Sequence, residues 1–112
     1  MKQVKAFIKP NKLDDVVQAL HKIHGLTGLS VGEVRGFGRT RGSKDSSPDP
    51  DFFDFVAHFR VEAVCQDDLV DTICQAIESS AHTGLRGDGK IYVSPIEHAV
   101  RISTGERGEV AV

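Results

Sequence analysis

The apolar residues of this chain repeat with two different periods, and these periods alternate along the sequence. Two segments are apolar at every second residue, as in a strand with one buried face: Val4, Ala6 and Ile8, and later Phe59, Val61, Ala63 and Cys65. Each is followed by apolar residues at helical spacing: Leu13, Val16, Val17, Leu20 and Ile23 after the first, and Leu69, Val70, Ile73, Cys74, Ile77 and Ala81 after the second. The order of strand and then helix therefore occurs twice.

Turn-forming residues divide the first half of the chain. The first strand is expected to end at Pro10, Asn11 is placed to cap the first helix, and that helix is expected to stop near Gly25. Residues 29–37 lie between glycines and predict a second strand. The first half therefore predicts a strand, a helix and a second strand.

The second half has the same order. Its helix is expected to begin at residues 67–68 and to end by Gly84, and a short strand is expected at residues 90–93. A final extended piece is expected at about 99–102, followed by a polar tail at 103–112. The order β-α-β-β-α-β predicts an α+β, ferredoxin-like sandwich of antiparallel sheet and two helices, and the whole chain of 112 residues is expected to form a single domain.

Residues 39–58 break both periods. The segment is rich in glycine, serine, proline and aspartate, which form turns and loops, and it has no apolar repeat. A loop of this length in a compact domain serves binding or regulation, or is a passive insertion, and both interpretations remain open at this point. Three aromatic side chains near its end would anchor the loop or be presented to a protein partner: Phe52, Phe53 and Phe55.

The charge and the apolar runs disfavour two classes of partner. The formal net charge is −2, with acidic and basic residues mixed, so the basic excess that nucleic-acid binding usually needs is missing. The apolar runs are far shorter than the ~20 residues needed to cross a bilayer, and the first residues lack the apolar core of a signal peptide. We expect a cytoplasmic protein that does not insert into a membrane.

The cysteines and histidines do not predict a metal centre. Cys65 and Cys74 fit small apolar positions, and a redox pair is the alternative. His21 and His24 would share one side of the first helix, where a weak surface metal contact is conceivable, but acidic or cysteine partners at ligand spacing are missing. We therefore expect no bound metal and no enzymatic activity, with an acylphosphatase-type hydrolase or a metal-tolerance trimer as the alternatives for this fold.

The stretch at residues 83–90, Thr-Gly-Leu-Arg-Gly-Asp-Gly-Lys, has the chemistry of a phosphate-binding loop. Closely spaced glycines let backbone N–H groups approach an anion, and Lys90 adds a positive charge. The spacing differs from that of a Walker A loop, and a simple turn remains the alternative. Two other stretches have related ingredients: Arg35-Gly36-Phe37-Gly38-Arg39, and the segment with Arg101 and Arg107.

Several segments, in the same order, resemble the PII signal-transduction protein family. Residues 83–93 look like the second signature of that family, with Tyr92 where phenylalanine or tryptophan is usual. Three further matches follow the family order: Ile8-Lys9-Pro10, Gly36-Phe37-Gly38-Arg39, and Arg101-x-x-Thr104-Gly105-Glu106. The resemblance spans essentially the whole chain and fails mainly between residues 40 and 58.

The resemblance implies a homotrimer with an adenine nucleotide in each cleft between neighbouring subunits. One subunit would contribute Gly36, Phe37, Gly38, Arg39, Glu62 and Val64. The other would contribute Ser30, Gly87, Asp88, Gly89, Lys90 and Arg101. Backbone N–H groups, Lys90 and Arg101 would face the phosphates, while Phe37 and Val64 would supply apolar cover.

Departures from the family pattern change the ligands that we expect. Thr40 stands where the family has a glutamine for metal and 2-oxoglutarate, and His58 stands where a lysine contacts the same ligand. Ser103 replaces an arginine that helps to hold the outer phosphates, so ADP and AMP are expected to be favoured over ATP. A small anion such as bicarbonate is then a hypothetical second ligand, held by Gly38, Arg39, Thr40 and His58.

We therefore expect a regulator that controls an unidentified transporter or enzyme through its loop at 39–58. The only tyrosine of the chain is Tyr92, so this loop has no tyrosine to be uridylylated. Two alternatives remain. One is a standard nitrogen-regulatory PII protein that responds to ATP and 2-oxoglutarate, and the other is a trimeric adaptor whose Phe52 to Phe55 loop binds its partner without any ligand.

Overall fold

The computed structural model describes residues 1–36 and 56–112. The helices and strands follow the expected order, and their bounds are β1 (Lys2–Ile8), α1 (Leu13–His21), β2 (Ser30–Gly36), β3 (Val56–Cys65), α2 (Val70–Ala81) and β4 (Gly89–Pro95). Short 3-10 turns precede both helices, at Pro10–Lys12 and Asp67–Leu69, and a third one follows at Gly108–Ala111. The β-α-β-β-α-β order predicted from the apolar periods is confirmed.

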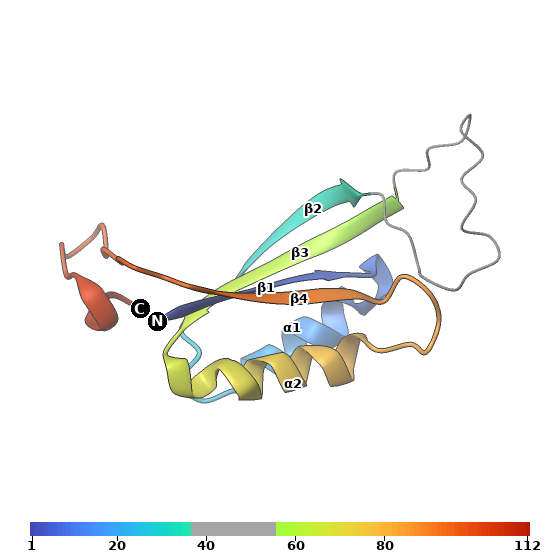
Figure 1. The fold of residues 1–112 in the computed structure, drawn as a ribbon, viewed down its shortest axis with the longest axis horizontal. Coiled ribbons are helices and arrows are strands. Elements are labelled where there is room, and N and C mark those ends of the chain that lie inside the picture. Colours follow the sequence, from blue (N-terminus) through green and yellow to red (C-terminus); the bar gives the residue numbers. More distant parts are fainter. Residues whose placement is uncertain (37–55) are drawn as a thin grey trace.

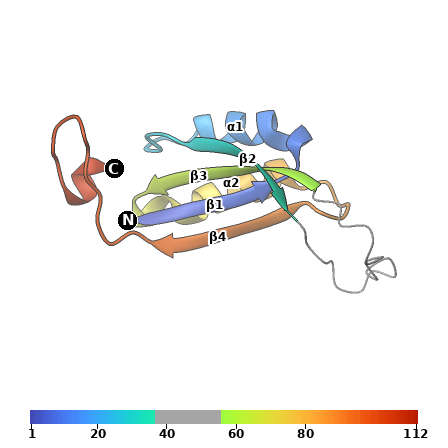
Figure 2. The same cartoon turned by 90° about the horizontal axis from the view of Figure 1, so that it is seen from above.

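The four strands form one antiparallel sheet in the order β2-β3-β1-β4. Both helices pack on the same face of this sheet, and the opposite face carries neither of them (Figures 1 and 2). This arrangement is the α+β, ferredoxin-like sandwich that the sequence predicts. In the following, the face opposite the helices is called the helix-free face.

The core lies between the sheet and the two helices. The buried apolar residues come from four elements and lie at positions predicted to face inward: Val4, Ala6 and Ile8 on β1, Val16 and Leu20 on α1, Val61, Ala63 and Cys65 on β3, and Ile73, Ile77 and Ala81 on α2. No residue of β2 or β4 is buried. Phe59, Cys74 and Leu69 pack against this core while staying partly exposed. Burial of these apolar side chains supplies the main driving force for folding.

The first helix differs from its prediction at both ends. Asn11 does not cap it, because Pro10 starts a 3-10 turn in which Asn11 is the middle residue, and α1 begins only at Leu13. Proline favours a first helical position since its fixed φ fits there and its missing N–H would have no partner. The helix ends at His21 rather than near Gly25, which instead sits in the following loop with a φ of +93°.

The third strand is longer than predicted. It begins at Val56, so residues 56–58 belong to the sheet and not to the loop expected at 39–58. Pairing with β2 continues as far as Gly36 opposite Val56, and this backbone ladder does not depend on the alternation of apolar side chains. The remainder of that loop, up to residue 55, lies outside the described residues.

The C-terminal segment is a turn and not the expected extended piece. Val100 bridges to Arg107, the amide of Arg101 donates to the carbonyl of Glu106, and the chain then enters the 3-10 turn at Gly108–Ala111. Gly105 lies in the turn between Arg101 and Glu106 and has a φ of +76°, a conformation that other residues rarely adopt. The predicted tail at 103–112 therefore has defined local structure.

Within residues 1–36 and 56–112, no helix is both long and apolar enough to cross a membrane.

Candidate functional site

The helix-free face carries most of the described residues that were predicted to bind a nucleotide. Residues paired across antiparallel strands point to the same side, and the register pairs Ser30 with Glu62, Gly36 with Val56, and Lys90 with Phe7. On β1 and β3, the positions of Phe7, Val56 and Glu62 alternate with buried residues. The register places their partners on β2 and β4 on the same face. The sheet therefore presents Ser30, Gly36, Glu62, Val64 and Lys90 away from the helices.

These residues spread over the whole length of the sheet. Gly36 and Lys90 lie toward the end of the sheet where β1 ends and β4 begins, whereas Val64 lies near the other end of the strands. Arg101 lies beyond the far end of β4, and the five residue steps from Lys90 to the end of that strand already span about 17 Å. Figure 1 shows the glycine loop before β4 and the C-terminal segment at opposite ends of the molecule.

The family resemblance assigns one set of residues to each of two subunits. In the structure, each of these sets is split between the two ends of the sheet. Gly36 is six residue steps along the β2–β3 ladder from the level of Glu62, which is about 20 Å. In the second expected set, Lys90 and Arg101 are likewise at opposite ends. Within one chain, Gly36 lies at the same end of the sheet as the glycine loop, although β2 and β4 are opposite edge strands, and Ser30 lies next to Glu62.

The glycine loop has a backbone that only glycine adopts readily. Gly84 and Gly87 each have a φ of +80°, and Gly89 has a φ of +104°. A Cβ at Gly89 would stand 1.6 Å from the carbonyl oxygen of Phe7, because β4 starts directly against β1 at this point. The close approach explains why glycine is required at residue 89.

Asp88 turns its carboxylate into the loop. Its Oδ2 accepts hydrogen bonds from the backbone N–H groups of Thr83, at 2.9 Å, and Gly84, at 3.2 Å. Its Oδ1 accepts from the Thr83 hydroxyl and forms an ion pair with Lys9 Nζ at 3.1 Å. The hydrogen bonds from the side chain and backbone of Thr83, with Lys9 and Gly84 adding to them, hold the pKa of Asp88 far below its usual range.

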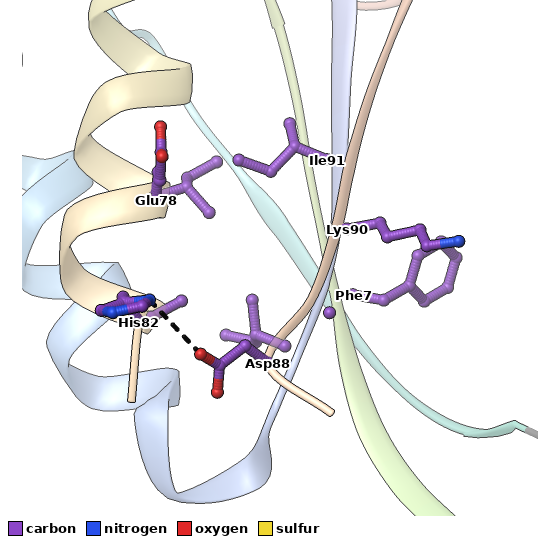
Figure 3. Close-up of a pocket in the computed structure, with 10 residues that line it drawn as sticks. Phe7, Glu78, His82, Asp88, Lys90 and Ile91 are labelled. Atoms are coloured by element: carbon purple, nitrogen blue, oxygen red, sulfur yellow. Dashed lines mark ion pairs between the residues drawn. The ribbon is translucent and has the colours of Figure 1, made fainter. Parts of the chain in front are cut away.

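Lys90 points the other way. Figure 3 shows Lys90 and Phe7 on one side of the strands and Asp88, His82 and Glu78 on the other. Beside Lys90 on the helix-free face, the rings of Phe7 and Tyr92 meet edge to face with centroids 6.2 Å apart. The amino group of Lys90 is thus presented on the face that also carries Glu62 and Ser30.

A shallow cavity of about 260 Å³ lies on the helix side of the same loop. It opens between the end of α2 and the adjoining ends of β1 and β4, and the side chains that line it include Ile77, Glu78, His82, Asp88 and Ile91 (Figure 3). The Nδ1 atom of His82 is 3.5 Å from Asp88 Oδ2. This cavity therefore lies on the helix side of the loop, whereas the side chain of Lys90 points to the helix-free face (Figure 3).

Glu62 is held by neighbours that the sequence patterns did not single out. Arg60 Nε lies 2.6 Å from its carboxylate, and the side-chain amide of Gln3 donates to it at 3.3 Å. The guanidinium of Arg60 lies close over Gly32, where an added Cβ would be 3.1 Å from Nη2. Arg60 and Gln3 alternate with core residues on β3 and β1, so the alternation predicted for these strands was the signal that could have found them.

Arg101 is tied into the C-terminal turn. Its Nη1 lies 3.4 Å from Glu106 Oε1, and its Nη2 donates to the carbonyl of Val110 at 3.4 Å. Thr104 Oγ1 also donates to Glu106, at 2.9 Å. Ser103, which stands at the position of a family arginine, is exposed in this turn.

Several predicted site residues lie outside the described part of the chain. They are Phe37, Gly38, Arg39, Thr40, Phe52, Phe53 and Phe55. His58 is described, and its ring Nδ1 is 3.1 Å from the carbonyl oxygen of Val56. The hypothetical anion and partner sites built on these residues therefore stay predictions.

The two cysteines lie in and beside the core. Cys65 is buried, Cys74 is partly buried, and both are free thiols. Burial raises the pKa of each thiol, and for Cys65 the nearby Cys74 adds to this rise. Among the described residues, no group of three or more histidine, cysteine or acidic side chains is placed to hold a metal ion.

The chain is similar to bacterial regulators over its whole length. It is 45% identical over 113 positions to the nitrogen regulatory protein P-II of Azospirillum brasilense, 49% identical to that of Rhodobacter capsulatus, and 43% identical to nitrogen regulatory protein P-II 1 of Escherichia coli strain K12. Each match covers 100% of both chains. The family described as nitrogen regulatory protein P-II matches residues 1–106.

Fold and similarity together define a signal-transduction regulator of the ferredoxin-like class. The chain belongs to the P-II family of nitrogen regulatory proteins, as the signature at residues 83–93 predicted. Proteins of this family are trimers that regulate partner proteins.

Proposed function

We propose that this protein is a homotrimeric regulator that binds adenine nucleotides in clefts between its subunits. The observation that carries this proposal is the distribution of Lys90, Glu62, Ser30 and Arg101 along the sheet and beyond its end. Cationic and backbone N–H groups suited to phosphates lie at one end, and a second cation lies beyond the other. A nucleotide needs both sets at once, and a second copy of the chain would bring them together.

The positions in the fold favour a particular division of the site between subunits. One subunit would supply the glycine-loop end, with Gly36, Gly87, Gly89 and Lys90, and with Phe37, Gly38 and Arg39 following Gly36 in the chain. Its neighbour would supply the other end, with Ser30, Glu62, Val64 and Arg101. This division differs from the one that the family resemblance implied, because it keeps residues of the same sheet end in the same subunit.

The chemistry of the two sets suits opposite parts of a nucleotide. Lys90 and the loop N–H groups suit phosphate oxygens, and Arg101 adds a second cation. The Ser30 hydroxyl and the Glu62 carboxylate suit the polar edge of the base, and Val64 supplies apolar contact. Asp88 would contribute through its backbone, since its carboxylate is already hydrogen-bonded within the loop.

The choice among nucleotides follows from Ser103. A hydroxyl there lacks the charge that an arginine would bring to the outer phosphates, so ADP and AMP would be favoured over ATP. Bicarbonate is the proposed second ligand, at Gly38, Arg39, Thr40 and His58. The nucleotide and the anion together would set the conformation of the segment at 39–58, through which this cytoplasmic protein would control a transporter or an enzyme, with Phe52, Phe53 and Phe55 as its contacts.

A standard nitrogen-regulatory response to ATP and 2-oxoglutarate is the second candidate. The observation that favours it is the full-length identity of 43–49% with proteins named for nitrogen regulation. Thr40 and His58 stand against it, since neither reproduces the glutamine and lysine of the family pattern.

Isothermal titration separates these candidates. The protein is titrated with ADP, AMP and ATP, each alone and then with bicarbonate or 2-oxoglutarate. The proposal predicts binding of ADP and AMP, tightened by bicarbonate and unaffected by 2-oxoglutarate. Tightening of ATP by 2-oxoglutarate supports the second candidate instead, and partner binding without binding of any nucleotide supports a constitutive adaptor.

A further inference from the structure

We propose that Asp88 is a positioning residue, whose carboxylate holds residues 83–89 in the shape that presents backbone N–H groups and Lys90 to the nucleotide. This inference rests on the proposed function, since it gives the Asp88 side chain a task at the same site. The family resemblance implied that Asp88 contacts the nucleotide. Its described contacts are instead with the protein itself.

The hydrogen bonds of Asp88 fix both ends of the loop. Asp88 stands two residues before Lys90 and accepts from the N–H groups of Thr83 and Gly84, at 2.9 and 3.2 Å. The Thr83 hydroxyl donates to Asp88 and accepts from the N–H of Leu85 at 3.0 Å. The side chains of residues 83 and 88 thus close the turn that contains Gly84 and Gly87, both at positive φ.

Lys9 connects this closed loop to the rest of the fold. Its Nζ lies 3.1 Å from Asp88 Oδ1 and 3.1 Å from Thr83 Oγ1, with its side chain about one-fifth exposed. Lys9 directly follows β1, Thr83 follows α2 by two residues, and Asp88 directly precedes β4. One cation and one carboxylate therefore join the ends of three elements at the start of the loop.

The direction of the side chains separates the positioning group from the binding group. Asp88 lies on the helix side of the strands and Lys90 on the helix-free side (Figure 3). A carboxylate facing bound phosphates would repel them, and Asp88 avoids this because it is turned back onto Lys9 and Thr83. Holding the loop before the ligand arrives also lowers the ordering cost of binding.

The test compares four variants in the full-length protein. Asp88→Ala removes the carboxylate, Thr83→Val removes the hydroxyl while keeping the shape, and Thr83→Ser restores the hydroxyl. Glu78→Gln is the matched control, because Glu78 lines the same cavity and none of the described contacts joins its carboxylate to the loop. ADP affinity is measured by titration, amide hydrogen exchange of residues 83–89 is measured without nucleotide, and circular dichroism confirms folding.

We expect Asp88→Ala and Thr83→Val to weaken ADP binding by about tenfold or more and to speed exchange at Gly84 and Leu85 in the free protein. Thr83→Ser and Glu78→Gln should keep the affinity and exchange of the wild type. If Asp88→Ala does not fold, the Val and Ser variants at residue 83 still decide the question.

Two results overturn the inference, and they differ from failure of the proposed function. The first is weaker ADP binding with unchanged amide exchange, which would make Asp88 a direct contact. The second is unchanged affinity in both Asp88→Ala and Thr83→Val. A wild type that binds no adenine nucleotide would overturn the proposed function itself, and the inference with it.

Discussion

The two halves of the chain form the same β-α-β unit, but the loops that follow their helices are held in different ways. β1, α1 and β2 form the first unit, and β3, α2 and β4 form the second, with both helices packed on one face of the sheet (Figure 2). The loop after α1 is closed by backbone hydrogen bonds, such as those from Ile23 to Leu20 and from Leu26 to Ile23. The loop after α2 is closed by the charged side chains of Lys9 and Asp88 together with Thr83.

This difference shows which of the two loops is available to bind a ligand. Leu26 and Leu29 of the first loop pack against the core, so that loop completes the structure. The second loop has the exposed residues Leu85, Arg86 and Gly87, and Thr83 hydrogen-bonds to both Asp88 and Leu85 within it. A connection that is held by side chains can present its backbone N–H groups to a ligand, which a packed apolar connection does less readily.

The largest expected effect contrasts Gly89, where the second loop enters β4, with Gly28 in the first loop. In Gly89→Ala, the new Cβ would collide with the Phe7 carbonyl oxygen and the backbone would keep an unfavourable positive φ. We expect a loss of more than about 4 kcal/mol in the free energy of unfolding, or failure to fold. In Gly28→Ala the Cβ meets nothing within 4 Å, and we expect a change within about 0.5 kcal/mol. Guanidinium unfolding measures both, and equal effects would contradict this difference between the loops.

The cores of the two halves should be equally sensitive. Leu20 on α1 and Ile77 on α2 are 0% and 2% exposed, and truncation of either to alanine leaves a cavity between helix and sheet. Each variant should lose about 2–5 kcal/mol of unfolding free energy in guanidinium titration. A much smaller loss in one half would show that its helix packs less tightly than the structure has it.

Acid should reduce the stabilisation that the side chain of Asp88 gives to the second loop. Asp88 has its pKa lowered from an ordinary value of 3.8, so its contribution to stability is full above that value and is lost as the pH falls toward the folded pKa. The free energy of unfolding of the wild type should therefore fall more steeply below about pH 4 than that of Asp88→Asn. The pKa of Asp67 is also lowered, by a hydrogen bond from the N-terminal ammonium, but this contribution is common to both proteins and cancels in the comparison.

Parallel pH profiles of the wild type and Asp88→Asn would contradict the hydrogen-bonded placement of Asp88.

The smallest expected effect compares two lysines. Lys12 lies 3.6 Å from Asp15 on α1, a single long ion pair with a mostly exposed carboxylate, and Lys12→Met should change the unfolding free energy by less than about 0.5 kcal/mol. Lys9→Met removes both a hydrogen bond and an ion pair of the second loop. We expect a clearly larger drop in melting temperature for Lys9→Met, and the reverse order would contradict the role given to Lys9.

Sequence periodicity predicted β1, β3 and both helices because the buried face of each was clear on its own. Val4, Ala6 and Ile8 identify the inner face of β1 without knowledge of any other strand, and Ile73 and Ile77 do the same for α2. The start of β3 was missed because Val56 and His58 join the sheet through backbone pairing, which the side-chain pattern does not encode. The end of α1 was misplaced because Gly25 marks the loop and not the helix end.

The residues of the candidate site were chosen from the sequence, but their arrangement could not be. The signature pattern identified Gly87, Gly89 and Lys90, yet the inward direction of Asp88 depends on Lys9, which lies almost 80 residues away in the sequence. The separation of Lys90 and Arg101 likewise depends on the path of β4 through the sheet. Both are tertiary properties, so only the structure defines them.

A mixed-trimer experiment tests most directly the claim that opposite ends of the sheet from neighbouring subunits form one nucleotide site. Lys90→Gln and Arg101→Gln chains, each of which should bind ADP at least about tenfold more weakly alone, are produced together and titrated with ADP. If Lys90 and Arg101 of each site come from different subunits, random mixing around a ring restores native affinity at about a quarter of the sites. No recovery, in trimers that contain both chains, would contradict the account.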